Sequence, residues 1–189
     1  MPGFGLFYTY GRKMSIPKPN ATLIKKINQN DRNAQFQLFE MTKGMLYSTC
    51  FRIIGDEEEA HDILQEVYVE VFQNIRKLKN PEALISWMKT IAVRKAIHHS
   101  KKKIYFEPVE NREMETTEAF DSWFDAEILD QAILSLPSGA KAVFLLTTVE
   151  GYSHMEAAKL LNITVSTSHS QLHYAKSLLK SRITKLLKA

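Results

Sequence analysis

Apolar residues recur along this chain at spacings of three and four, the period of one face of an α-helix. One such stripe runs through a helix expected to end at Gly55, and a second lies on a helix expected from about Glu57 to Leu78, with Asp56 as its cap. Glycine and proline are scarce, seven and six in all, so the pattern predicts an all-α protein. The positions expected to be buried are Phe36, Phe39, Leu46, Cys50 and Ile53 on the first helix, and Ala60, Ile63, Leu64, Val67, Val71 and Ile75 on the second.

The second helix also carries a polar face. Acidic residues in its first turn are explained by the positive end of the helix dipole. Asp62, Glu66 and Glu70 lie beyond that turn and form a polar, acidic face with Gln65. This face is therefore predicted to meet a basic partner.

A third helix is expected from Pro81 to about Lys103, because proline suits a first helical turn. Its C-terminal part is basic and contains no acid. Bases complementing the helix dipole would explain the last turn alone, but Arg94 and Lys95 lie about two turns earlier. A nucleic-acid face is therefore the favoured interpretation. Trp87 beside it is expected either to stack on unpaired bases or to pack against Leu84 and Ile91.

Residues 150–176 predict two short helices joined by a tight turn, which is typical of a helix-turn-helix. Ser153 and Glu156 have capping-box spacing, Asn162 suits a left-handed turn position, and Thr164 is expected to cap the second helix. Helices expected over 126–136 and 138–149 complete a four-helix domain. The side chains expected to face its core are Met155, Ala158, Leu160, Leu161, Val165, Leu172 and Ala175.

Charge is divided unevenly along the chain. Residues 104–130 hold nine acids and one base, Arg112, although the whole chain has a net charge of +4. The remainder is therefore strongly basic, which indicates a polyanionic partner such as DNA or RNA. The predicted organisation is two small helical domains joined by an acidic flexible linker. The expected parts are a disordered extension over 1–20, a first domain over 21–103, the linker over 104–125 and a helix-turn-helix domain over 126–189.

Several function classes are disfavoured by the sequence. It has no apolar run of 18 residues for a membrane span, no signal peptide is recognised, and its single cysteine excludes an internal disulfide. His169 and His173 are four apart but lack a third metal ligand nearby. Phosphate-binding glycine loops, nucleophile elbows and HExxH motifs are also missing from it. We therefore expect no metal, cofactor, catalytic residue or small-molecule substrate.

Four stretches taken in order resemble the bacterial RNA polymerase sigma factors, in particular the extracytoplasmic-function (ECF) group. Residues 59–67, EAHDILQEV, are similar to the polymerase-binding helix of that family, and 87–92, WMKTIA, to its promoter-melting segment. Residues 134–137, LSLP, and 150–154, EGYSH, are similar to the entry of its second DNA-binding domain. The resemblance covers about residues 30–187.

The resemblance implies a cytoplasmic bacterial protein that binds core RNA polymerase and promoter DNA, with an anti-sigma factor as a further candidate partner. Polymerase would be bound through Asp62, Gln65 and Glu66, and the spacer would thread toward the polymerase active-site channel. In the first domain, the minus-ten element would be melted and bound by Lys79, Asn80, Trp87, Arg94, Lys95, His98, Lys101, Lys102 and Lys103. In the helix-turn-helix, the minus-thirty-five element would be read by Ser166, Thr167, His169, Ser170, Gln171, His173, Tyr174 and Lys176.

Some positions depart from the family pattern. Arg94 stands where asparagine is usual, His98 where aspartate is usual, and Tyr174 where arginine is usual. The promoter sequence therefore does not transfer from relatives. Two alternatives stay open: a stand-alone helix-turn-helix regulator, and a degenerate polymerase-binding protein that does not open DNA.

Overall fold

The computed structural model describes residues 21–106 and 126–186 of this chain, and they contain helices and connecting turns but no strand. They fall into two compact units, divided after His99. The predicted extension over 1–20 and most of the acidic linker lie outside the described residues. None of the described helices has the length and apolar character needed to cross a membrane. The all-α fold class is confirmed.

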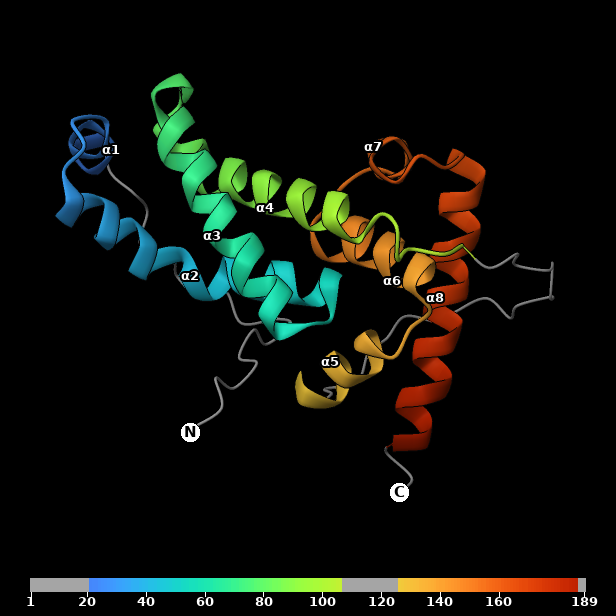
Figure 1. Ribbon diagram of the computed structural model, residues 1–189. Coiled ribbons are helices and arrows are strands. Elements are labelled where there is room, and N and C mark those ends of the chain that lie inside the picture. The colour runs from blue at the N-terminus through green and yellow to red at the C-terminus, as the bar shows by residue number, and fades with distance from the viewer. Residues whose placement is uncertain (1–20, 107–125, 187–189) are drawn as a thin grey trace. The chain divides into compact units, whose positions relative to one another are not determined.

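The first unit is built from α1 (Ala21–Asn28), α2 (Arg32–Ile54), α3 (Glu57–Asn74) and α4 (Leu84–Ser100). Short 3₁₀ turns, η1 (Ile75–Lys77) and η2 (Pro81–Ala83), join α3 to α4. Helices α2 and α3 pack along each other (Figure 1). All six apolar residues predicted for the α3 stripe are buried, so the helical period of the sequence correctly identified its core face.

The ends of α2 and α3 follow from local chemistry. Gly55 adopts a left-handed conformation (φ 81°) and its amide donates to the Phe51 carbonyl, which ends α2. The Asp56 carboxylate then accepts the Glu59 amide and begins α3. Both predicted caps are confirmed, and together they turn the chain so that α2 and α3 meet.

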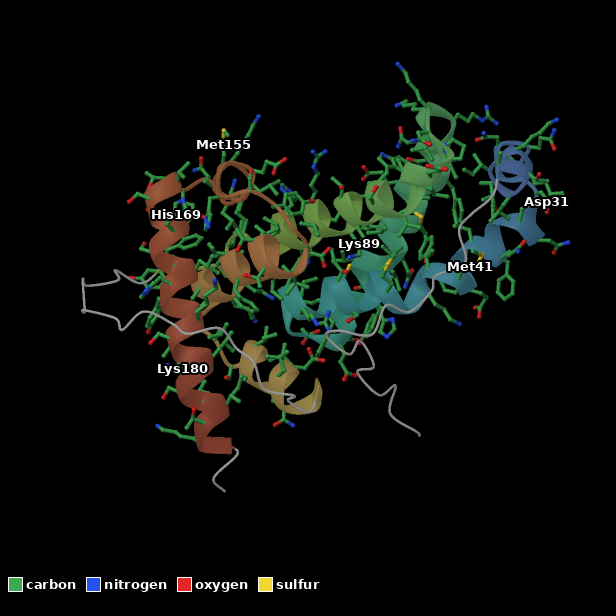
Figure 2. All side chains as sticks on the ribbon, turned by 180° about the vertical axis from the view of Figure 1, so that it is seen from behind. Asp31, Met41, Lys89, Met155, His169 and Lys180 are labelled. Atoms are coloured by element: carbon green, nitrogen blue, oxygen red, sulfur yellow. The ribbon has the colours of Figure 1, made fainter. Side chains whose placement is uncertain are left out.

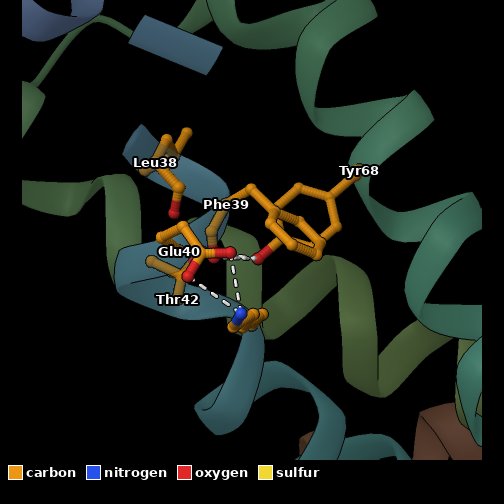
Figure 3. A network of polar contacts seen from close by, with 6 residues as sticks. Leu38, Phe39, Glu40, Thr42 and Tyr68 are labelled. Atoms are coloured by element: carbon orange, nitrogen blue, oxygen red, sulfur yellow. Dashed lines mark hydrogen bonds and ion pairs between the residues drawn. The ribbon is translucent and has the colours of Figure 1, made fainter. Parts of the chain in front are cut away.

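A buried polar contact joins α2 to α3 (Figure 3). Thr42 Oγ1 donates to the Leu38 carbonyl at 2.7 Å and lies 2.7 Å from the Tyr68 hydroxyl. The Tyr68 ring lies against Phe39, with centroids 4.9 Å apart. Burial, partly offset by the Thr42 contact, raises the pKa of Tyr68 to about 12. The neutral hydroxyl therefore serves as a fixed hydrogen-bonding group within the core.

The second unit contains α5 (Ala126–Leu134), α6 (Ser138–Phe144), α7 (His154–Leu161) and α8 (Val165–Leu186). One turn of π-helix, η3 (Leu145–Val149), extends α6. Helices α5, α6 and α7 all pack against α8, which runs past each of them (Figure 1). The predicted four-helix domain with its helix-turn-helix, α7–α8, is confirmed.

The start of α6 also holds residues that follow α4 in sequence. The Gly139 amide donates to the Tyr105 carbonyl at 3.1 Å, and the Tyr105 amide donates to Ser138 Oγ at 2.9 Å. A Cβ added at Gly139 would lie 2.6 Å from the Phe106 ring and 2.7 Å from the Tyr105 carbonyl oxygen. Only glycine lets the two segments approach this closely.

Three apolar predictions were wrong. Phe36, Met155 and Val165 are 64, 71 and 43 % exposed, respectively. Phe36 lies two residues from the buried Ala34 and Leu38, on the opposite side of α2, whereas Met155 and Val165 lie in the first turns of α7 and α8. Met155 projects from α7 into solvent (Figure 2).

Candidate interfaces for nucleic acid and for an acid-binding partner

The acidic face of α3 is on the surface. Asp62, Gln65 and Glu66 are all exposed, at spacings of three and four that place them on one side of the helix. The residues between them, Ile63 and Leu64, are buried. The tertiary structure therefore leaves this face open to a partner while its opposite side forms the core.

Lys95 of α4 pairs with two acids of α3. Its Nζ lies 3.2 Å from an Oε of Glu66 and 3.2 Å from an Oε of Glu70. Partial burial lowers the pKa of Lys95, but the hydrogen bonds and charges of Glu66 and Glu70 outweigh that effect and hold the pKa above its usual value. Lys95 therefore belongs to the border between the acidic and the basic face, which the sequence did not reveal because the two helices are remote along the chain.

Several other bases of α4 and of the turn after it are exposed to solvent. Arg94 and His98 are exposed, as are the lysines at 101–103 that follow the helix. Trp87, which is expected either to stack on unpaired bases or to pack against Leu84 and Ile91, is half-buried, whereas those two residues are buried. The Asn80 side chain accepts the Glu82 amide at 3.0 Å, while Lys79 is exposed beside it. Lys79, Asn80, Trp87, Arg94 and His98 lie on the first unit and form a surface that we call the α4 face. The lysines at 101–103 follow it directly in the chain but belong to the second unit.

Helix α8 presents one exposed polar stripe. Ser166, His169, Ser170, His173 and Lys176 are exposed at spacings of three and four. Figure 2 shows His169 near the α7 end of α8, with Lys180 further along the helix. This stripe, which we call the α8 face, has side chains suited to base edges and phosphates.

Gln171 does not join the α8 face. Its side chain is 2 % exposed, on the same buried side of α8 as Ser168 and Ala175. Thr167 and Tyr174 are half-buried at the edges, and Thr167 Oγ1 lies 2.8 Å from Thr164 Oγ1 in the cap of the helix. Its polar character made Gln171 a candidate from sequence, but its position in the helical period places it inside.

Both the start of α7 and the turn between α7 and α8 have the hydrogen bonds and the backbone conformation that the sequence predicted. Ser153 Oγ accepts the Glu156 amide, and the Glu156 carboxylate accepts the Ser153 amide, which completes a capping box. The Ser153 hydroxyl also donates to Glu156 Oε2 at 2.7 Å, and this hydrogen bond, with the one from the Ser153 amide, lowers the pKa of Glu156. Asn162 has φ 58° and ψ 46°, and Thr164 Oγ1 accepts the Thr167 amide at 3.0 Å. The two helices are therefore fixed in a helix-turn-helix geometry.

His154 was not among the predicted site residues, yet it touches one of them. Its ring stacks on His169 with centroids 3.7 Å apart, and its Nδ1 lies 2.8 Å from Ser168 Oγ. A sequence signal did exist, because the first turn of α7 must approach the first turns of α8 in a helix-turn-helix. Among the described residues, no three histidine, cysteine or acidic side chains gather as a metal site.

Comparison with known proteins identifies both units. Residues 38–103 match the family model of Sigma-70 region 2, and residues 126–179 match that of Sigma-70, region 4. The first match contains the acidic face of α3 and the α4 face, and the second contains the helix-turn-helix. The two matches stand in the order that the sequence motifs predicted.

Full-length relatives agree with the two matches. The chain is 25 % identical over 179 residues to the ECF RNA polymerase sigma factor SigW of Bacillus subtilis, covering 86 % of this chain and 96 % of that protein. It is 28 % identical over 141 residues to the sigma factor SigV of the same organism, covering 74 and 84 %. A solved structure of the sigma factor RpoE with the anti-sigma factor NepR, from Bartonella quintana, aligns at 17 % identity with a TM-score of 0.48, over 81 and 96 % of the two chains. Because both sigma-70 regions are present and the relatives match along nearly their whole length, the chain belongs to the sigma-70 family of RNA polymerase sigma factors, in its ECF group.

Proposed function

We propose that this sigma factor binds core RNA polymerase through Asp62, Gln65 and Glu66 of α3, and promoter DNA through the α4 and α8 faces. A sigma factor is a promoter-specificity subunit that directs transcription initiation, and this chain has that role through its family. It is a binding protein rather than an enzyme. Its place of action is then the bacterial cytoplasm, where polymerase and promoters meet.

The proposed polymerase-binding role of α3 rests on the exposure of Asp62, Gln65 and Glu66. The three α3 residues are exposed on a helix whose predicted apolar stripe is buried, so their side chains are not part of the core. Acidic side chains there suit a basic surface of polymerase, because opposite charges steer and orient an encounter. Glu66 remains 59 % exposed even though it pairs with Lys95.

The α4 face is proposed to hold the minus-ten element. Its exposed Arg94 suits phosphates, while the half-buried Trp87 is available for an unpaired base. The exposed Lys101, Lys102 and Lys103, which follow α4 in the chain, are proposed to add phosphate contacts. Lys79, Asn80 and His98 extend this surface. Lys95 pairs with Glu66 and Glu70, and it is proposed to contact DNA once polymerase binding releases it from Glu66.

The α8 face is proposed to read the minus-thirty-five element. The N-terminal turns of a second helix-turn-helix helix meet base edges, and the exposed Ser166, His169 and Ser170 occupy those turns. His173, Tyr174 and Lys176 follow, with Thr167 at the edge. None of these residues is an arginine, so the α8 face is expected to bind DNA weakly by itself. Its attachment to the first unit, in the same chain, raises its effective concentration at the promoter. An anti-sigma factor that covers either surface is the proposed regulator.

The proposal is tested by mixing the full chain with core polymerase and a fork-junction DNA library. We expect a stable complex with polymerase and selective enrichment of promoter sequences. Failure to bind polymerase would contradict the proposal. Binding to polymerase without selecting DNA would support the degenerate polymerase-binding protein, and selective DNA binding without polymerase would support a stand-alone regulator.

A further inference from the structure

We propose that His154 of α7 positions the His169 side chain for base readout, so that recognition of the upstream element depends on a residue outside the reading helix. The inference rests on the proposed role of the α8 face. It adds a specificity-determining residue that is not itself in the exposed stripe of α8. The carrying observation is a contact between the two helices of the helix-turn-helix.

The contact is a stacked pair of imidazole rings. The ring centroids of His154 and His169 are 3.7 Å apart and the ring planes differ by 26°. His154 is the first residue of α7 and is half-buried, whereas His169 is exposed near the start of α8. One face of the His169 ring is therefore covered by protein, and its remaining surface is available to DNA.

His154 is itself held in place. Its Nδ1 lies 2.8 Å from Ser168 Oγ, and Ser168 is fully buried. The preceding residue, Ser153, is fixed by the capping box with Glu156. A buried hydroxyl and a capped helix start thus anchor the ring on which His169 rests.

An anchored ring changes the cost of binding. A solvent-exposed side chain loses rotamer freedom when it contacts a base, and a side chain already held in place loses less. By this principle, pre-positioning is worth roughly two- to tenfold in affinity. The gain applies only to sequences that His169 contacts favourably, so it appears as specificity for the upstream element.

The surroundings of His154 favour its neutral form. Burial lowers the pKa of His154, and the nearby His169 and Lys176 lower it further. Two protonated rings at this distance would repel each other. A neutral His154 can stack without that cost while one ring nitrogen bonds Ser168.

A double-mutant cycle in the polymerase complex tests the proposal. The variants are His154→Ala, His169→Ala, both together, and His154→Phe, which keeps a ring that can stack. Each full-length variant is assembled with core polymerase, and binding is measured across an upstream-element library with every base substituted in turn. Met155→Ala is the matched control, because Met155 neighbours His154 on α7 and is 71 % exposed.

We expect His154→Ala to lower discrimination about two- to tenfold at the base positions that His169→Ala also affects. The double variant should match His169→Ala alone, His154→Phe should restore part of the loss, and Met155→Ala should retain wild-type discrimination. Equal weakening at every sequence, a further loss in the His169→Ala background, or no effect of either single change would overturn the proposal. Failure of the wild-type chain to assemble with polymerase would instead count against the proposed function.

Discussion

At the residue scale, one lysine links two surfaces that the sequence treats as separate. Lys95 reaches Glu66 and Glu70 across the α3–α4 packing, and the three side chains line an open groove of about 420 Å³ with Arg94 and His98. Ion pairs this exposed contribute about 0–1 kcal/mol each. They are therefore weak enough for a polymerase surface to replace them.

Glu66→Lys is expected to weaken the affinity for core polymerase by roughly tenfold, because it reverses a charge at the centre of the acidic face. Binding is measured with the full chain by titration of labelled protein. Lys95→Met is the control, since it removes the same ion pair but keeps Asp62, Gln65 and Glu66. An equal loss in both variants would show that local pairing, and not the acidic face, governs the affinity.

A pH effect is expected from His154. Its pKa in the folded chain is depressed by burial, His169 and Lys176, so between the folded value and the unfolded value of about 6.5 the unfolded state binds more protons. The stability that neutral His154 contributes is fully present above its unfolded pKa. It is lost as pH falls through its folded pKa, because the unfolded chain then binds a proton more readily than the folded chain. Thermal unfolding of the second unit should therefore show a lower Tm at pH 5 than at pH 7.5. The decrease should be smaller in His154→Phe; an identical decrease would exclude His154 as its source.

At the scale of elements, two glycines illustrate opposite constraints. Gly44 lies inside α2 with open space where a Cβ would be, whereas Gly139 at the start of α6 faces the Phe106 ring and the Tyr105 carbonyl. Sequence alone does not distinguish the two glycines, because both are helical residues and their neighbours in space are remote in the chain or missing. The packing of residues 104–106 against α6 makes the difference.

Gly139→Ala is expected to destabilise the protein by about 1–3 kcal/mol, because the new methyl group overlaps atoms of Tyr105 and Phe106. Gly44→Ala should stabilise it by up to about 1 kcal/mol, since alanine is the better helix former. Urea unfolding of both variants measures the difference. A stable Gly139→Ala protein would mean that residues 104–106 readily leave α6.

The α7–α8 turn gives a second element-scale prediction. Asn162 is held at φ 58°, where a residue with a Cβ is strained unless its side chain tolerates the left-handed region. Asn162→Ala should cost about 1–2 kcal/mol, while Asn162→Gly should be neutral or slightly stabilising. Calorimetry of the two variants checks this ordering, and equal stabilities would contradict it.

At the scale of the whole molecule, the acidic and basic residues proposed to bind polymerase and DNA lie in different parts of the chain. The exposed lysines at 101–103 follow the basic end of α4 in the chain, whereas the exposed acids of α3 belong to the other unit. Changing all three lysines to glutamate should abolish promoter opening in the polymerase complex. The slope of log K against log[salt] should become shallower by up to about 2–3, because each phosphate contact contributes roughly 0.7–0.9.

A matched control has the same change of charge at another place. Lys25, Lys26 and Arg32 are exposed at α1 and the start of α2, outside every proposed interface. Changing those three to glutamate should leave the salt slope for promoter binding largely intact. Similar losses in both triple variants would indicate a general effect of net charge rather than a defined basic surface.

The sequence by itself determined the helical elements and their ends. Apolar spacing identified the buried side of α3, and Gly55, Asp56, the Ser153–Glu156 box and Asn162 marked boundaries, because caps and periodicity depend on residues close together in the chain. The exposure of Asp62, Gln65 and Glu66 followed from the same period. The order of motifs also led to the sigma-70 family.

Only the tertiary structure decided which side chains meet across elements. The burial of Gln171, the pairing of Lys95 with Glu66 and Glu70, the stack of His154 on His169 and the contact of residues 104–106 with Gly139 all join residues remote along the chain or depend on which neighbours cover a helix face. The exposure of Phe36, Met155 and Val165 has the same origin. Periodicity fixes the direction in which a side chain points from its helix axis, whereas packing fixes what it meets there.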